Sequence, residues 1–164
     1  MARDTNGNRI GEFAYAVLCD PKDFSLIRID NGVNAQAGMC HFGGPVGGIN
    51  SDQTSSAVLL QYFGNGVGVG SLVPARTAVA VGMPDPDHVF AGGLVVPGDS
   101  GSGVISSDGR AVGVNVTTGV HVGSIGTGGV DAGLVGMTRL GPQRDRAESV
   151  LGINLSLQTA PLNP

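Results

Sequence analysis

Short segments in which apolar and polar residues alternate dominate this chain, and turn-forming residues separate them. Alternation with a period of two is typical of half-buried β-strands. The first two predicted strands, Ile10–Val17 and Phe24–Ile29, are joined by a turn over Cys19–Lys22. Further strands are predicted at Ala57–Phe63, Gly66–Val73, Ala78–Gly82, Gly103–Ser106 and Ala111–Thr117. Many short strands separated by turns predict an all-β fold built on barrels.

One helix is expected, near the C-terminus, over Pro142–Leu151. Proline suits the first helical turn, and Gly152 provides a stop. After it, Ile153–Leu157 alternates as an edge strand or a packed tail, and residues 159–164 are expected to fray. A loop is predicted at Met83–His88, because its prolines cannot donate to a sheet ladder.

Composition narrows the class of protein. The 164 residues include 29 glycines without a fixed period, 41% hydrophobic residues and 13% charged residues, which excludes collagen and argues against disorder. Lys22 is the sole lysine and the net charge is −4, so a nucleic-acid partner is not expected. No apolar run reaches about 18 residues, so no membrane-spanning helix is expected.

The candidate chemistry centres on Gly98-Asp99-Ser100-Gly101-Ser102-Gly103. Glycines beside a serine permit a tight turn in which backbone N–H groups converge next to the hydroxyl. The segment resembles the GDSGG/GDSGS signature of chymotrypsin-like serine proteases. The resemblance implies that Ser100 is the nucleophile and that the N–H groups of Gly98 and Ser100 form the oxyanion hole. A plain glycine-serine turn is the alternative interpretation.

A second segment supports the resemblance. Asp23-Phe24-Ser25-Leu26-Ile27 is similar to the strand that carries the triad aspartate in that family. Such a carboxylate orients the catalytic histidine and stabilises its imidazolium. Asp23 precedes Ser100, as the order of the family requires. An ordinary aspartate at the start of a strand is the alternative.

Three further matches concern the surroundings of Ser100. Cys40-His41-Phe42-Gly43 is similar to a segment that opens the second barrel in bacterial, actinobacterial-type members, and the match implies that His41 pairs with Asp99. Arg76 and Arg139 are the alternative partners of Asp99. Leu94 matches the base of the specificity pocket, which implies uncharged substrate side chains. The strand that binds substrate backbone is matched by Thr117, Thr118 and Gly119.

The general base of such a site is missing from its expected place, because no histidine precedes Asp23. A serine hydroxyl without a base is a poor nucleophile at neutral pH, so the chain is expected to be nearly inactive. The resemblance therefore implies a chymotrypsin-like double barrel that lacks its N-terminal part. Residues 1–36 would be the remnant of the first barrel, and residues 37–164 a complete second barrel with its helix and tail.

The resemblance implies a serine endopeptidase acting on polypeptides, secreted as a longer parent protein, without cofactor or metal. An incomplete barrel leaves strand edges unpaired, so self-association is also expected. A non-catalytic pseudoprotease or binding module that kept the scaffold is the second hypothesis.

Overall fold

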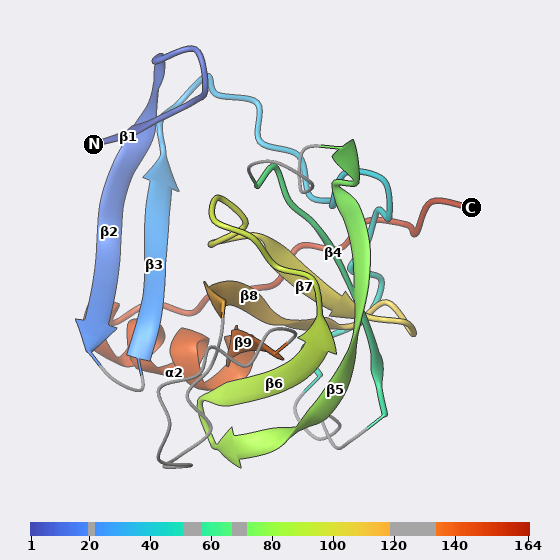
Figure 1. Cartoon of the computed structure of the whole chain (residues 1–164). Coiled ribbons are helices and arrows are strands. Elements are labelled where there is room, and N and C mark those ends of the chain that lie inside the picture. The colour runs from blue at the N-terminus through green and yellow to red at the C-terminus, as the bar shows by residue number, and fades with distance from the viewer. Residues whose placement is uncertain (20–21, 51–56, 67–71, 119–133) are drawn as a thin grey trace.

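Nine β-strands and one α-helix make up the described part of the chain in this computed structural model (Figure 1). The described residues are 1–19, 22–50, 57–66, 72–118 and 134–164. The strands form two separate sheets, an open sheet from the N-terminal segment and a closed barrel from the remainder.

The open sheet has the order β1-β2-β3, with antiparallel neighbours. It comprises β1 (Ala2–Arg3), β2 (Arg9–Cys19) and β3 (Lys22–Ile29). The long β2–β3 hairpin confirms the two strands expected at this end, and Cys19 pairs with Lys22 at its tip. Figure 1 shows this hairpin standing beside the barrel.

The barrel closes in the order β4-β5-β6-β9-β8-β7. Its strands are β4 (Leu59–Phe63), β5 (Ala75–Asp85), β6 (His88–Gly93), β7 (Gly103–Ser106), β8 (Ala111–Thr118) and β9 (Leu134–Arg139). All six pairings are antiparallel. Closure removes the unpaired edges that an open sheet would expose. The described core is the barrel interior, where Leu60, Tyr62, Val89 and Met137 are fully buried.

The helix α2 (Leu140–Leu151) packs against β8 and β9, and it ends where Gly152 adopts a left-handed conformation with φ 66°. Asp87, buried in the β5–β6 turn, accepts hydrogen bonds from the Arg146 guanidinium of α2. This ion pair fixes α2 to the β5–β6 hairpin of the barrel. No helix in the described ranges is long and apolar enough to cross a membrane.

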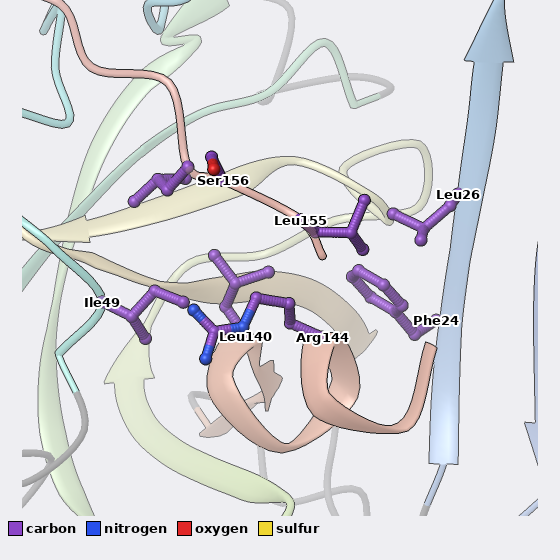
Figure 2. A pocket seen from close by; sticks show the side chains of 8 residues that line it. Phe24, Leu26, Ile49, Leu140, Arg144, Leu155 and Ser156 are labelled. Carbon is purple, nitrogen blue, oxygen red and sulfur yellow. The ribbon is translucent and has the colours of Figure 1, made fainter. Parts of the chain in front are cut away.

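Several sequence predictions need correction. The loop expected at Met83–His88 is wrong, because β5 continues to Asp85 and β6 begins at His88. Strands β6 and β9 were not predicted. The strand expected over Gly66–Val73 falls mainly outside the described residues, and its described ends are not in a strand. Of the two alternatives for Ile153–Leu157, the edge strand is wrong and the packed tail is confirmed, since Leu155 and Leu157 are half-buried and the Leu155 N–H bonds Glu148 of α2. Figure 2 shows the Leu155 side chain facing Leu26 and Phe24 of β3.

Candidate active site

Asp23 and Ser100 border the same cleft, although they lie in different sheets. This cleft has a volume of about 350 Å³ and separates the N-terminal hairpin from the barrel. One wall is β3, from which Asp23, Phe24 and Ser25 contribute. The other wall combines Ser100, in the turn before β7, with β8 at Val114–Val116. The topology thus joins the two residues that local motifs single out.

The turn that carries Ser100 is pinned to β8 on one side. The Gly101 N–H donates to the Asn115 carbonyl at 2.7 Å, and the Asn115 N–H donates to the Ser102 carbonyl at 2.9 Å. Gly98, at φ 100°, and Gly101, at φ 86°, both occupy the region that favours glycine. Ser100 itself stays exposed at the tip of this turn, which leaves its hydroxyl accessible to a substrate.

Two backbone donors of this turn are unused. Among the described residues, the N–H groups of Gly98 and Ser100 donate no hydrogen bond, whereas that of Asp99 bonds the Val96 carbonyl at 3.0 Å. The Ser100 hydroxyl likewise has no partner there. Unpaired backbone N–H groups are one requirement of an oxyanion hole.

The Asp99 side chain is fully buried and has three hydrogen-bond donors. The Arg76 Nη2 atom lies 2.5 Å from Oδ1, the Gly66 N–H lies 2.9 Å from the same oxygen, and the Val96 N–H lies 2.8 Å from Oδ2. Burial alone raises the pKa of Asp99, but these hydrogen bonds and the charge of Arg76 outweigh it, so the pKa lies below its ordinary value. Asp99 is therefore an ionised anchor that holds the Ser100 turn.

The expected pairing of His41 with Asp99 is wrong. Arg76, one of the two alternative partners, occupies that position, and both members of the pair are buried. His41 is exposed, its ring lies edge-on to Phe42 at 4.7 Å, and its carbonyl accepts a hydrogen bond from Asn163. A guanidinium keeps its charge at every physiological pH and bonds in a fixed fork, which suits a buried carboxylate better than an imidazole.

Arg139, the other alternative partner of Asp99, lies elsewhere. Its guanidinium donates to the Pro86 carbonyl at 2.8 Å, at the β5–β6 turn. The cation that pairs with Asp99 thus comes from the barrel strand β5, on which Arg76 lies, and not from β9, which carries Arg139.

No described histidine borders the cleft. His88 forms a pair with Asp85 at the β5–β6 turn, with 3.0 Å between Nδ1 and Oδ2, and neither residue lines the cleft. His121 lies outside the described residues. The cleft therefore offers a nucleophile and a carboxylate, but its described lining contains no imidazole to accept the serine proton.

Of the predicted substrate-binding residues, Leu94 does not line the cleft. Leu94 is 46% exposed, and its carbonyl accepts a hydrogen bond from the buried Tyr62 hydroxyl at 2.5 Å. Thr117 and Thr118 form the last residues of β8, directly after Val116, which does line the cleft. Gly119 lies outside the described residues. Their roles in binding substrate stay predictions.

Two glycines that support the site were not singled out. A Cβ atom at Gly64 would lie 2.2 Å from the Asp99 Oδ1 atom, and one at Gly66 would lie 2.4 Å from the Val96 Cγ2 atom. The loop after β4 must therefore lack side chains at both positions for Asp99 to be enclosed. The glycine-rich sequence from Gly64 onward indicates that close packing is possible there. It does not reveal that the Asp99 side chain is the group that packs against these glycines.

In comparisons with known proteins, no family model and no curated protein matches the chain. Within the described residues, no group of three or more His, Cys, Asp and Glu side chains is placed to hold a metal ion.

Proposed function

We propose that this chain is a serine endopeptidase of the chymotrypsin-like type, with a polypeptide as its substrate. The observation that carries the proposal is the shared cleft, because Asp23 and Ser100 come from separate sheets and yet border one cavity. The unused N–H groups of Gly98 and Ser100 and the buried Asp99–Arg76 pair support it. The N-terminal hairpin corresponds in this proposal to the remnant of a first barrel.

In the proposed reaction, the Ser100 Oγ atom attacks the scissile carbonyl while its proton passes to an imidazole. Asp23 accepts the other N–H of that ring and stabilises the imidazolium. The N–H groups of Gly98 and Ser100 hold the oxyanion of the tetrahedral intermediate. The imidazolium then protonates the leaving amine, which leaves an acyl group on Ser100. Water activated by the same imidazole hydrolyses this ester and restores the serine.

The imidazole is the one component that the described cleft lacks. The cleft volume of about 350 Å³ exceeds the roughly 150 Å³ that holds a benzene ring, so the cleft has room for an imidazole. Without that ring the hydroxyl remains a weak nucleophile, and only slow turnover is expected. Because Leu94 matches by sequence the base of the specificity pocket in chymotrypsin-like proteases, uncharged substrate side chains are the proposed preference.

A non-catalytic binding module is the second candidate. The observation that favours it is the absence of an imidazole from the described cleft lining. A protein that only binds has no need for unused N–H groups beside an exposed serine. The reactivity of Ser100 therefore separates the two functions.

Labelling with a fluorophosphonate tests the proposal, because this probe phosphonylates serines that lie in an oxyanion hole. We expect slow, stoichiometric labelling at Ser100, located by peptide mass spectrometry. Ser100→Ala should abolish the adduct, and the matched control Ser102→Ala should retain it. Absence of labelling, or equal labelling of Ser100→Ala, would contradict an enzymatic role and favour the binding module.

A further inference from the structure

The connecting segment Leu94–Asp99 leads from β6 to the turn before β7, and buried side chains hold both of its ends. At one end, the Asp99 carboxylate accepts a hydrogen bond from the Arg76 Nη2 atom at 2.5 Å. At the other end, the Leu94 carbonyl accepts hydrogen bonds from the Tyr62 hydroxyl at 2.5 Å and from the Arg76 Nη1 atom at 3.5 Å. Arg76 therefore bonds both ends of the connecting segment, and Tyr62 bonds its start.

Tyr62 and Arg76 are direct neighbours across the β4–β5 ladder. Residues that lie opposite each other in such a ladder project from the same face of the sheet, which here is the barrel interior. Tyr62 is fully buried, and the Arg76 guanidinium carbon lies 5.5 Å from the centroid of its ring, within cation–π distance. The Tyr62 ring thus supports the guanidinium, while its hydroxyl bonds the connecting segment.

The Tyr62 hydroxyl acts as a donor to the Leu94 carbonyl. Burial raises the pKa of Tyr62, so the hydroxyl is protonated at neutral pH. A buried hydroxyl that loses its partner is unfavourable, and the Leu94 carbonyl is the partner that the structure provides. Rotation of the peptide that follows Leu94 would break this bond. The hydroxyl therefore fixes the direction in which the connecting segment leaves β6.

The second half of the connecting segment is a closed turn over Val96–Asp99. The Asp99 N–H donates to the Val96 carbonyl at 3.0 Å, and the Val96 N–H donates to the Asp99 Oδ2 atom at 2.8 Å. Pro97 and Gly98, the latter at φ 100°, occupy its central positions, which fits a type II turn. Because these bonds and the proline restrict the turn internally, a displacement at its start carries Gly98 along with it.

We propose that Tyr62 is a positioning residue for the oxyanion hole. Its hydroxyl holds Leu94 and, through the Val96–Asp99 turn, directs the N–H groups of Gly98 and Ser100. This inference rests on the proposed function, in which these two N–H groups stabilise the oxyanion. Tyr62 lies inside the barrel, so it acts through the connecting segment and not on the substrate.

Tyr62→Phe removes the hydroxyl and keeps the ring that packs in the core and against the guanidinium. Fluorophosphonate labelling of Ser100 over a range of probe concentrations separates the phosphonylation step from binding of the probe. Loss of one oxyanion donor costs about 10²–10³-fold and a misdirected donor costs less, so we expect the phosphonylation rate constant to fall roughly fivefold to fiftyfold. The concentration that gives half the maximal rate should stay the same.

Two further readings separate positioning from a defect in folding. The final stoichiometry of labelling in Tyr62→Phe should equal that of the parent chain, because molecules that fail to fold lower the stoichiometry. The matched control is Tyr15→Phe, which alters the other tyrosine of the chain, in β2 and outside the cleft lining, and it should label at the parent rate. A Tyr62→Phe rate constant equal to that of the parent would overturn this inference alone. An unlabelled parent chain would overturn the proposed function.

Amide shifts of the ¹⁵N-labelled chains test the geometry without any reaction. In Tyr62→Phe we expect shifts at Val95, whose N–H belongs to the same peptide group as the Leu94 carbonyl, and also at Gly98 and Ser100. Shifts that stop at Val95 would refute transmission through the turn.

If Tyr62→Phe does not fold, 3-fluorotyrosine incorporated into the Tyr15→Phe chain tests the same bond. Fluorine beside the hydroxyl makes it a stronger donor at nearly unchanged size. Shifts at Gly98 and Ser100 relative to the unfluorinated Tyr15→Phe chain are again expected, and their absence would overturn the role given to Tyr62.

Discussion

Arg76→Met removes the cation from the buried pair that anchors the Ser100 turn. Arg76 is 6% exposed and Asp99 is 0% exposed, so the substitution leaves an ionised carboxylate in the interior. Breaking such a pair typically costs about 3–5 kcal/mol. Asp99 keeps the N–H donors of Gly66 and Val96, so we expect the lower end, about 3 kcal/mol. Urea unfolding at pH 7 measures the difference.

The pH dependence provides a sharper test. In the parent chain the pKa of Asp99 lies below the ordinary 3.8, so its stabilising contribution is complete above that value and is lost as pH falls through the folded-state pKa. In Arg76→Met the hydrogen bond and the charge of Arg76 are lost, so the pKa of Asp99 is higher than in the parent chain. As pH falls, Asp99 is therefore protonated in the variant before it is protonated in the parent chain, which removes the unpaired buried charge. The difference in free energy of unfolding between the two chains should narrow between pH 7 and pH 4. A gap below about 1 kcal/mol at pH 7, or one independent of pH, would refute the role given to this pair.

Two further predictions concern the loop after β4 and the open sheet. Gly64→Ala should lower the free energy of unfolding by about 1–3 kcal/mol, because the new Cβ atom would meet the Asp99 carboxylate. The control Gly48→Ala has open space around it and should change the free energy of unfolding by less than about 0.5 kcal/mol. Equal effects of the two substitutions in urea unfolding would contradict this prediction. The open sheet exposes Phe13 and Leu18, so sedimentation should show self-association that Leu18→Glu weakens, and a concentration-independent monomer mass would argue against it.

Elements with strong local signals were predictable from the sequence. β7 has the predicted bounds, Gly103–Ser106, because turn residues flank a short apolar run. Helix α2 includes all of Pro142–Leu151, and Gly152 ends it as expected. β6 and β9 were missed because His88–Gly93 and Leu134–Arg139 do not alternate between apolar and polar residues. Closure of the barrel buries residues of these strands, and closure is a tertiary property.

In the candidate site, too, local motifs were predictable from the sequence, whereas contacts between distant residues were not. Local motifs indicate Asp23 and Ser100, and chain order alone suggests that the two belong together. The choice of Arg76 over His41 as the partner of Asp99 depends on which strand lies beneath the turn. The need for glycine at position 64 also becomes evident only when the approach of Asp99 is known. Contacts between residues distant in sequence leave no local pattern, so sequence reasoning could name candidates for them but not choose.

In the proposed function, Asp23 and Ser100 are two parts of one site that needs an imidazole between them. The most direct measurement is the rate of fluorophosphonate labelling at Ser100 with and without added imidazole, in the parent chain and in Asp23→Asn. A general base contributes about 10²–10⁴-fold, so partial occupancy by free imidazole should accelerate labelling of the parent at least tenfold. Asp23→Asn should lose most of that acceleration while the rate without imidazole stays the same. Equal acceleration in both chains, or none in either, would contradict the shared site.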